Sequence, residues 1–148
     1  MMRLPMLVAG LWAGLLLGIA LIAAPATFAT LAPADAGRVV NRIFAQEAYL
    51  SLALAVFLYF VARRDAHAAA AASASSVFSL NLALIFGTLF CTVAGYFALQ
   101  PMLQAARAGQ GSLSFATLHM IAAGLFALKM LLVLTLAWRL SGRRHSLD

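Results

Sequence analysis

Four long apolar runs constrain this chain more than any other feature of its sequence. They cover residues 5–31, 43–62, 77–99 and 115–138, and charged or Gly/Pro/Ser-containing breaks separate them. A helix needs about 20 mostly apolar residues to cross the hydrocarbon core of a bilayer, and each run reaches that length. The pattern predicts an all-α fold, a four-helix transmembrane bundle that forms a single integral membrane domain over residues 1–148.

The composition agrees with a membrane protein and argues against other classes. Hydrophobic residues make up 65% of the chain and charged residues 9%, whereas soluble domains carry about 25% charged residues. The formal charge of +6 comes from arginines at the ends of apolar runs, where they act as topology signals. We therefore expect the lipid bilayer as the surrounding partner and no nucleic acid.

The arginine distribution predicts the orientation. One side of the membrane would carry Arg3, Arg63, Arg64, Arg139, Arg143 and Arg144, and the other Arg38, Arg42 and Arg107. The side richer in arginine stays in the cytoplasm, so both termini are expected there, in a multi-pass protein of the bacterial inner membrane. The first apolar run is too long for a signal peptide, whose apolar region has about 7–15 residues, and is expected to remain as a span.

Two connecting segments allow alternatives. Residues 34–42 alternate apolar and polar positions, as a short interfacial helix does, but a solvated loop fits equally well. Residues 66–76 are rich in Ala and Ser, which predicts a flexible cytoplasmic connector; the alanines would also suit an extended helix.

Two stripes of small residues predict close helix packing, because small residues let backbones approach in lipid. Their members are Gly10, Gly14 and Gly18 in the first run and Gly87, Cys91 and Gly95 in the third. Packing inside the bundle is the favoured interpretation, and a seam between copies in a homo-oligomer is the alternative. Each stripe precedes a proline, Pro25 or Pro101, which suggests a parallel repeat of two hairpins or a chance resemblance between Ala/Leu-rich helices.

Two ionisable side chains enter the outer halves of their helices. Glu47 precedes Arg63 by about 24 Å of helix rise, and Ser51 shares its face one turn later. His119 lies at a similar depth before Arg139. Glu47 and His119 are therefore expected either to form a titratable pair or to be solvated separately in the headgroup layer.

Lys129 is the most unusual residue, because it lies about 15 Å before Arg139 and thus near the bilayer centre. A lysine there costs roughly 2.5–3.5 kcal/mol on insertion, so we expect it to face the bundle interior. Tyr59, Thr88 and Thr92 are its expected neighbours, although such threonines often bond only to their own helix. Replacement of this buried charge by methionine is expected to leave folding intact.

Catalytic and metal-binding patterns are missing from the sequence. It has no GxxxxGK[ST], GxSxG or HExxH motif and no dinucleotide-binding GxGxxG unit, so an enzyme is not expected. Haem or copper would need His119 together with methionines that are usually packing residues, and no cofactor or metal is predicted. The methionines that could serve are Met102, Met120 and Met130. His67 and His145 belong to the connector and the tail and are expected to be solvated, and Asp35, Asp65 and Asp148 lie in loops or the tail, which leaves no catalytic carboxylate pair.

Several short segments resemble a known family. These are Trp12-Ala-Gly14, Ala24-Pro25-Ala-Thr-Phe28, Ala36-Gly37, Phe44-Ala-Gln-Glu47 and Phe115-Ala-Thr-Leu-His119. They are similar to the transmembrane-protein-205-like family, domain of unknown function 4149, which implies a small four-helix membrane protein without an agreed activity. The architecture is more remotely similar to CopD-type and HemJ-type membrane proteins. Those place a histidine in the first helix, whereas the first histidine here is His67.

The function expected from these features is transport or binding of a small ligand or ion, with Glu47, His119 and Lys129 as the polar core of the bundle. The alternative is a non-catalytic assembly partner in a homo-oligomer or a larger membrane complex, in which the glycine stripes carry the function. An enzyme acting on a lipid or a quinone ranks third.

Overall fold

The computed structural model describes residues 3–73 and 79–142, and all regular secondary structure in that part of the chain is helical. Its elements form four helices long and apolar enough to cross a membrane, which makes the chain an integral, multi-pass membrane protein. The spans are Leu4–Thr30, Pro33–Ala68, Leu80–Arg107 and Phe115–Gly142. Arg143, Arg144, His145 and Asp148, which entered the sequence analysis, lie outside the described residues, as do residues 74–76.

The first and third spans each contain a short π-helical segment ahead of a proline. The first span runs through α1 (Arg3–Gly18), the π-helix Ile19–Ala23 and α2 (Ala24–Thr30); the third runs through α4 (Leu80–Thr92), the π-helix Val93–Ala98 and α5 (Leu99–Arg107). Proline has no N–H, and its ring collides with the carbonyl one turn earlier. The wider π turn is a common adjustment of such a helix, and both spans continue through Pro25 and Pro101.

The second span is one helix, α3 (Pro33–Ser73), of 41 residues. The separate interfacial helix considered for 34–42 is therefore absent, because this segment continues into the span with Pro33 and Asp35 in its first turn. At the other end the alanines extend the helix to Ser73. At 1.5 Å per residue, α3 is about 60 Å long, roughly twice the thickness of the hydrocarbon core.

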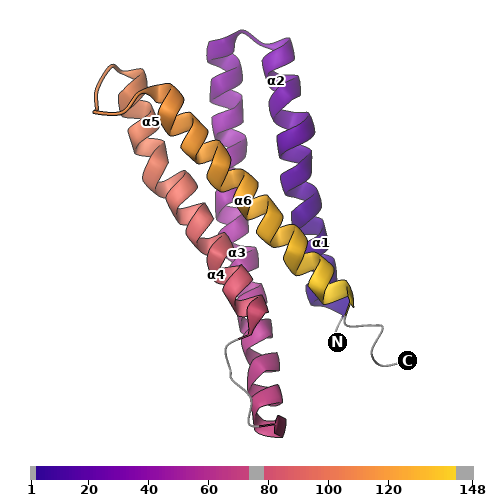
Figure 1. Ribbon diagram of the computed structural model, residues 1–148. Helices are drawn as coiled ribbons and strands as arrows, with labels where there is room; N and C mark the ends of the chain where they lie inside the picture. The colour runs from indigo at the N-terminus through magenta and orange to yellow at the C-terminus, as the bar shows by residue number, and fades with distance from the viewer. Residues whose placement is uncertain (1–2, 74–78, 143–148) are drawn as a thin grey trace.

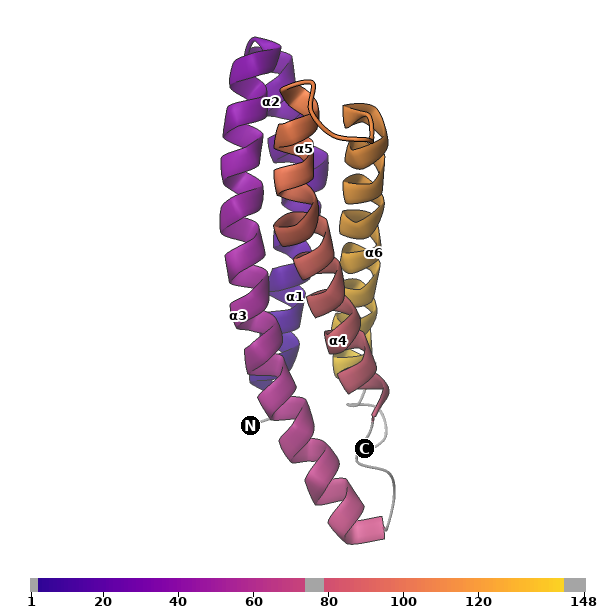
Figure 2. The same cartoon turned by 90° about the vertical axis from the view of Figure 1, so that its left-hand side faces the viewer.

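The last span, α6 (Phe115–Gly142), returns toward the starting end of the bundle. The turn before it contains Gly109 and Gly111 at positive φ, a conformation that favours glycine. Figure 1 shows the start of α1 and the end of α6 at the same end of the molecule. At the opposite end, the α2–α3 hairpin and the α5–α6 hairpin diverge, as Figure 1 shows. Figure 2, turned by 90°, shows α3 extending beyond the other helices at the end that holds the termini.

The apolar core lies in the half of the bundle nearer the termini, where α1 and α4 both pack against α6. Trp12 and Leu16 of α1, Leu58 of α3, Ile85 of α4 and Leu136 of α6 are its largest buried side chains. Many large apolar side chains face outward instead, among them Leu11, Phe90 and Trp138. Such an apolar exterior suits contact with lipid, since lipid tails are as apolar as leucine.

The two glycine stripes lie in different environments. A Cβ added at Gly87 would lie 2.9 Å from Leu132 Cδ1 of α6, and one at Gly95 would lie 3.4 Å from Leu125 Cβ, so this stripe packs inside the bundle, with Cys91 buried between the two.

The stripe of α1 does not pack inside the bundle, which corrects the favoured interpretation from the sequence. A Cβ added at Gly10, Gly14 or Gly18 would meet no atom within 4 Å. The face of α1 that enters the core carries Ala9, Trp12, Ala13 and Leu16 instead. Trp12 and Leu16 fill the interior with larger side chains, and this turns the glycines outward.

Candidate functional site

A buried ion pair joins the second and fourth spans. The Lys129 ammonium donates to both carboxylate oxygens of Glu47, with both Nζ–O distances at 2.8 Å. Each residue is at most 4% exposed. A charge is costly inside a membrane unless it is paired or wet, and here each charge supplies the partner that the other requires.

A chain of hydrogen bonds extends this pair to the first span. The Ser51 hydroxyl, one turn after Glu47 on α3, donates to Glu47 Oε1. The indole Nε1 of Trp12 on α1 donates to Ser51 Oγ at 2.9 Å. Among the described residues, no buried side-chain nitrogen or oxygen lacks a hydrogen-bond partner. Fully satisfied polar networks of this kind rigidify a core, and this one ties α1, α3 and α6 together.

Two phenylalanines lie one turn before the charged residues on the same two helices. Phe44 precedes Glu47 on α3, and Phe126 precedes Lys129 on α6; their rings meet edge to face with centroids 5.1 Å apart. The Lys129 ammonium lies 5.0 Å from the centroid of Phe126, within the range of a cation–π contact. The aromatic pair therefore forms an apolar layer next to the ion pair.

A pocket of about 450 Å³ occupies the space between the diverging hairpins. This volume lies in the range of about 300–1,000 Å³ that is usual for small-molecule sites. Glu47 and Lys129 line it, and so do the aromatic pair and several alanines. Its other polar lining residues are Asn41, Thr92, Tyr96, Gln100, Gln104, Arg107 and His119. Gln100 Nε2 donates to Asn41 Oδ1, which connects α5 to α3 across the pocket.

A basic group lies at the end of the pocket away from the ion pair. The guanidinium carbon of Arg107 lies 4.8 Å from the centroid of Phe115. The His119 ring stacks on the same phenylalanine, with ring centroids 5.8 Å apart and planes inclined by 15°. Arg107 also reaches toward α3, because a Cβ added at Gly37 would lie 3.8 Å from its Nη2 atom. These residues form the mouth of the pocket, defined here as Gly37, Arg107, Phe115 and His119.

Four of the six candidate ligand-binding residues from the sequence line one pocket: Glu47, Thr92, His119 and Lys129. The carboxylate of Glu47 is held by Lys129 and Ser51, while His119 stacks on Phe115, so Glu47 pairs with Lys129 and not with His119, the pairing that was one of the two alternatives from the sequence.

All three expected neighbours of Lys129 make their hydrogen bonds elsewhere. Thr88 Oγ1 donates to the Ile85 carbonyl oxygen at 2.7 Å, so it bonds within its own helix. Thr92 Oγ1 likewise donates to the Thr88 carbonyl oxygen at 2.8 Å. The hydroxyl of Tyr59 accepts from Arg63 Nη1 at 3.4 Å, three turns of α3 away from Glu47. Thr88 and Tyr59 are not part of the pocket lining.

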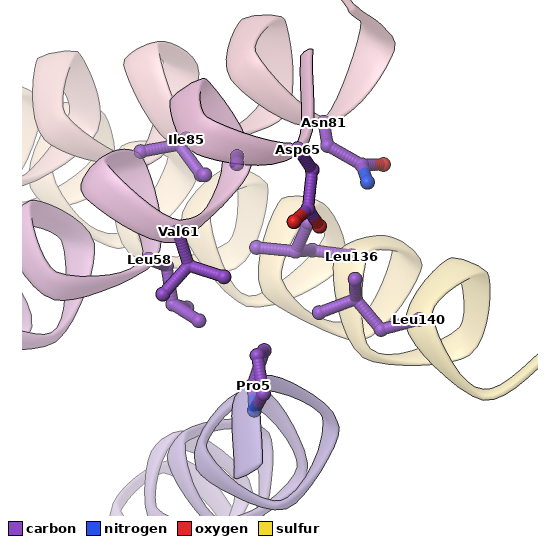
Figure 3. Close-up of a pocket in the computed structure, with 9 residues that line it drawn as sticks. Pro5, Leu58, Val61, Asp65, Asn81, Ile85, Leu136 and Leu140 are labelled. Atoms are coloured by element: carbon purple, nitrogen blue, oxygen red, sulfur yellow. The ribbon is translucent and has the colours of Figure 1, made fainter. Parts of the chain in front are cut away.

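A much smaller pocket lies at the end of the bundle that holds the termini. Figure 3 shows it bounded by Pro5, Leu58, Ile85 and Leu136, with the polar side chains of Asp65 and Asn81 at its edge. Its volume is about 20 Å³, which is room for about one water molecule. Nor does any group of three His, Cys, Asp or Glu side chains gather for a metal ion within the part of the chain that the structure describes.

Several site residues were not singled out as site residues in the sequence. Trp12 and Phe44 appeared only within family-like segments, and Arg107 only in the topology count. Phe126 and Gln100 carried no signal, since an isolated aromatic or amide in an apolar helix is common. Phe44 and Phe126 both precede a charged residue by three positions, but this spacing indicates a contact between them only once the Glu47–Lys129 pair is known.

Comparison with known proteins identifies the family. The model of the domain of unknown function DUF4149 matches residues 7–112, which is well over half of the chain. The chain belongs to the DUF4149 family. The matched part contains Trp12, Glu47, Ser51 and Arg107, whereas Lys129 and His119 follow it on α6. Searches of curated proteins and of solved structures gave no match.

Proposed function

We propose that this DUF4149 protein binds a small molecule inside the membrane and that binding is a step in its transport. The observation that carries the proposal is the pocket of about 450 Å³ with the Glu47–Lys129 pair in its lining. A purely structural ion pair needs no adjoining space of this size. Pockets with an apolar lining and a few convergent polar groups are the usual form of ligand sites.

The ion pair gives a ligand a way to act on the helices. Three spans are tied together through Trp12, Ser51, Glu47 and Lys129. A charged or strongly polar ligand group that competes for Glu47 or Lys129 weakens this tie. Ligand binding would then change the packing of α1 and α3 against α6, which is the kind of coupling that transport requires.

Filling the pocket tests this proposal. Ala123 of α6 is exposed and lines the pocket, so Ala123→Trp should occupy the ligand space. Ala53→Trp is the matched control, because Ala53 is exposed on α3 and lies outside the pocket lining. Native mass spectrometry of protein extracted in mild detergent should show a bound small molecule on the wild type and on Ala53→Trp, and none on Ala123→Trp. Equal adducts on the two variants would refute the proposal.

A second function, assembly with another membrane protein or with a second copy, is favoured by the outward stripe on α1. Gly10 and Gly14 are exposed and Gly18 is partly exposed, with open space in front of each. Stripes of this spacing are typical of close helix contacts in lipid. The stripe lies on the face of α1 opposite to Trp12, so assembly there and ligand binding in the pocket are compatible.

We also propose a parallel repeat of two hairpins. The spans at the start of each hairpin share a sequence of features: an α-helix, a π-helical segment, and then Pro25 or Pro101. Both π-helical segments contribute to the pocket, through Ala20 and Gly95. A pocket between two related halves is a common arrangement in transporters.

For the orientation, we propose that both termini face the cytoplasm of a bacterial cell, with the protein in the inner membrane. Arg63 and Arg64 follow the apolar part of α3, on the side of the termini, and the excess of arginine there supports this orientation. The pocket mouth would then face the periplasmic side of the membrane.

Cysteine labelling tests the orientation. In a background with Cys91→Ser, a membrane-impermeant maleimide should label Ser112→Cys in intact cells and should label His67→Cys only after the membrane is permeabilised. Both positions are exposed and lie at opposite ends of the bundle. Labelling of His67→Cys in intact cells, with Ser112→Cys protected, would reverse the orientation.

A further inference from the structure

The charge balance of the pocket favours an anionic ligand. Among the described residues that line it, Glu47 is the one carboxylate, and Lys129 already neutralises it. The second lining cation, Arg107, has its guanidinium over the Phe115 ring. Asp35, the other acidic residue near this end of α3, pairs with Arg38. The mouth therefore carries an excess positive charge.

The shape of the pocket favours a ligand that comes from the bilayer. α1 packs against α6 near the termini, but α2 and α6 move apart toward the opposite end (Figure 1). Small residues line both sides of this separation: Ala20 and Ala24 on the first span, and Ala123 and Ala127 on α6. Ala123 and Ala127 are exposed. On the side that faces lipid, the pocket is therefore lined by small apolar side chains.

The polar and apolar groups of the pocket are arranged in order along its length. Arg107 and His119 lie at the mouth, at the level where lipid headgroups would lie. Phe126 lies about 10 Å deeper than His119 by the rise of α6, and Ala122 and Ala123 lie between them. A molecule with one charged end and one apolar chain matches this order.

We propose, on the basis of the function proposed above, that the pocket takes a single-chain anionic lipid from the surrounding leaflet. Its acidic headgroup contacts Arg107 and the His119 ring N–H, and its chain runs along Ala123 toward Phe126 and Ala127. Arginine suits this role because its planar guanidinium binds phosphate or carboxylate oxygens through two parallel hydrogen bonds.

Three soluble probes test the proposal on the purified full chain in detergent. They are palmitoyl-lysophosphatidylglycerol, which is anionic, palmitoyl-lysophosphatidylcholine, which is zwitterionic with the same chain, and glycerol 3-phosphate, which has no chain. The wild type should bind the anionic lysolipid about tenfold more tightly than the zwitterionic one, as expected for one charge-assisted contact. Glycerol 3-phosphate should not compete, since the chain contributes most of the buried area.

Variants of Arg107 test whether the preference for the anionic lysolipid arises at the pocket mouth. Arg107→Gln should reduce the ratio of the two affinities to about one, and Arg107→Lys should restore part of it. Arg42→Gln is the matched control, because Arg42 is an exposed arginine on α3 outside the pocket lining and its loss should leave the ratio unchanged. Arg107 is exposed, so its replacement should not impair folding, which gel filtration of each variant verifies.

The outcomes separate this inference from the proposed function. Equal affinity of the wild type for both lysolipids, or an unchanged ratio in Arg107→Gln, would overturn the anionic-lipid inference. Competition by glycerol 3-phosphate as strong as that of the lysolipid would indicate a site for free anions instead. Undiminished binding of both lysolipids to Ala123→Trp would show that they bind outside the pocket and would overturn the lipid inference, whereas the proposed function stands or falls with the adducts on Ala123→Trp and Ala53→Trp.

Discussion

Lys129→Met is expected to destabilise the protein by about 3–5 kcal/mol, because it leaves the Glu47 carboxylate buried without its cation. This reverses the expectation from the sequence alone, in which the lysine had no fixed partner and its removal was harmless. Thermal unfolding in detergent, followed by the helical circular dichroism signal, measures the effect.

A double-variant cycle distinguishes a lost ion pair from lost packing. Glu47→Leu should destabilise the protein about as much as Lys129→Met, because it leaves the Lys129 ammonium buried without its carboxylate partner. The double variant Glu47→Leu/Lys129→Met removes both charges and should regain most of the stability, since a buried pair can often be replaced by apolar residues at little cost. Equal and additive losses in the cycle would show that the two residues act independently.

Gly87→Leu is expected to cost about 1–3 kcal/mol, the usual range for overpacking, while Gly14→Leu leaves the stability of the monomer unchanged. Even a methyl group at Gly87 would lie 2.9 Å from Leu132 Cδ1, whereas Gly14 faces open space. Urea or thermal unfolding of the two variants in the same detergent measures the difference. Similar losses in both variants would contradict the packing described for α1.

The same pair of variants reports on assembly. If the stripe on α1 joins copies of the chain, Gly14→Leu should shift the purified protein toward the monomer in light scattering, and Gly87→Leu should affect stability alone. An unchanged molar mass for Gly14→Leu would remove the stripe as a seam between copies.

The four spans were predictable because each needs only a long apolar run, and the sequence contains four of them. The inward direction of Lys129 followed from the cost of a charge near the bilayer centre. Its partner was not assigned. By helix rise Glu47 and His119 lie at similar depths and Lys129 lies deeper, so a Glu47–His119 pair and two separately solvated groups were the alternatives considered. The structure shows instead that the Lys129 side chain reaches Glu47.

The glycine stripes illustrate a limit specific to membrane proteins. In water, the polar face of a helix marks the side that faces outward, and the apolar face marks the core. In lipid both faces are apolar, so the spacing of Gly10, Gly14 and Gly18 identified a stripe but not its direction. The direction depended on Trp12, whose indole N–H has a partner only toward Ser51.

The pocket could not be predicted from the sequence, for a different reason. It lies between the two hairpins where they diverge, and the relative tilt of whole spans is not encoded in a local motif. Arg107 and Phe126 consequently carried no recognisable signal until the helices were placed.

The hydrogen bond from Trp12 gives the protein an optical reporter of its own. The chain contains two tryptophans; Trp12 is 1% exposed and bonded to the network, and Trp138 is 76% exposed on the outer surface of α6. Indole emission depends on the polarity and hydrogen bonding around the ring. In a Trp138→Phe background, the emission spectrum therefore comes from Trp12 alone, and a shift of its maximum on adding a ligand records a change at Ser51 and Glu47 without any attached dye.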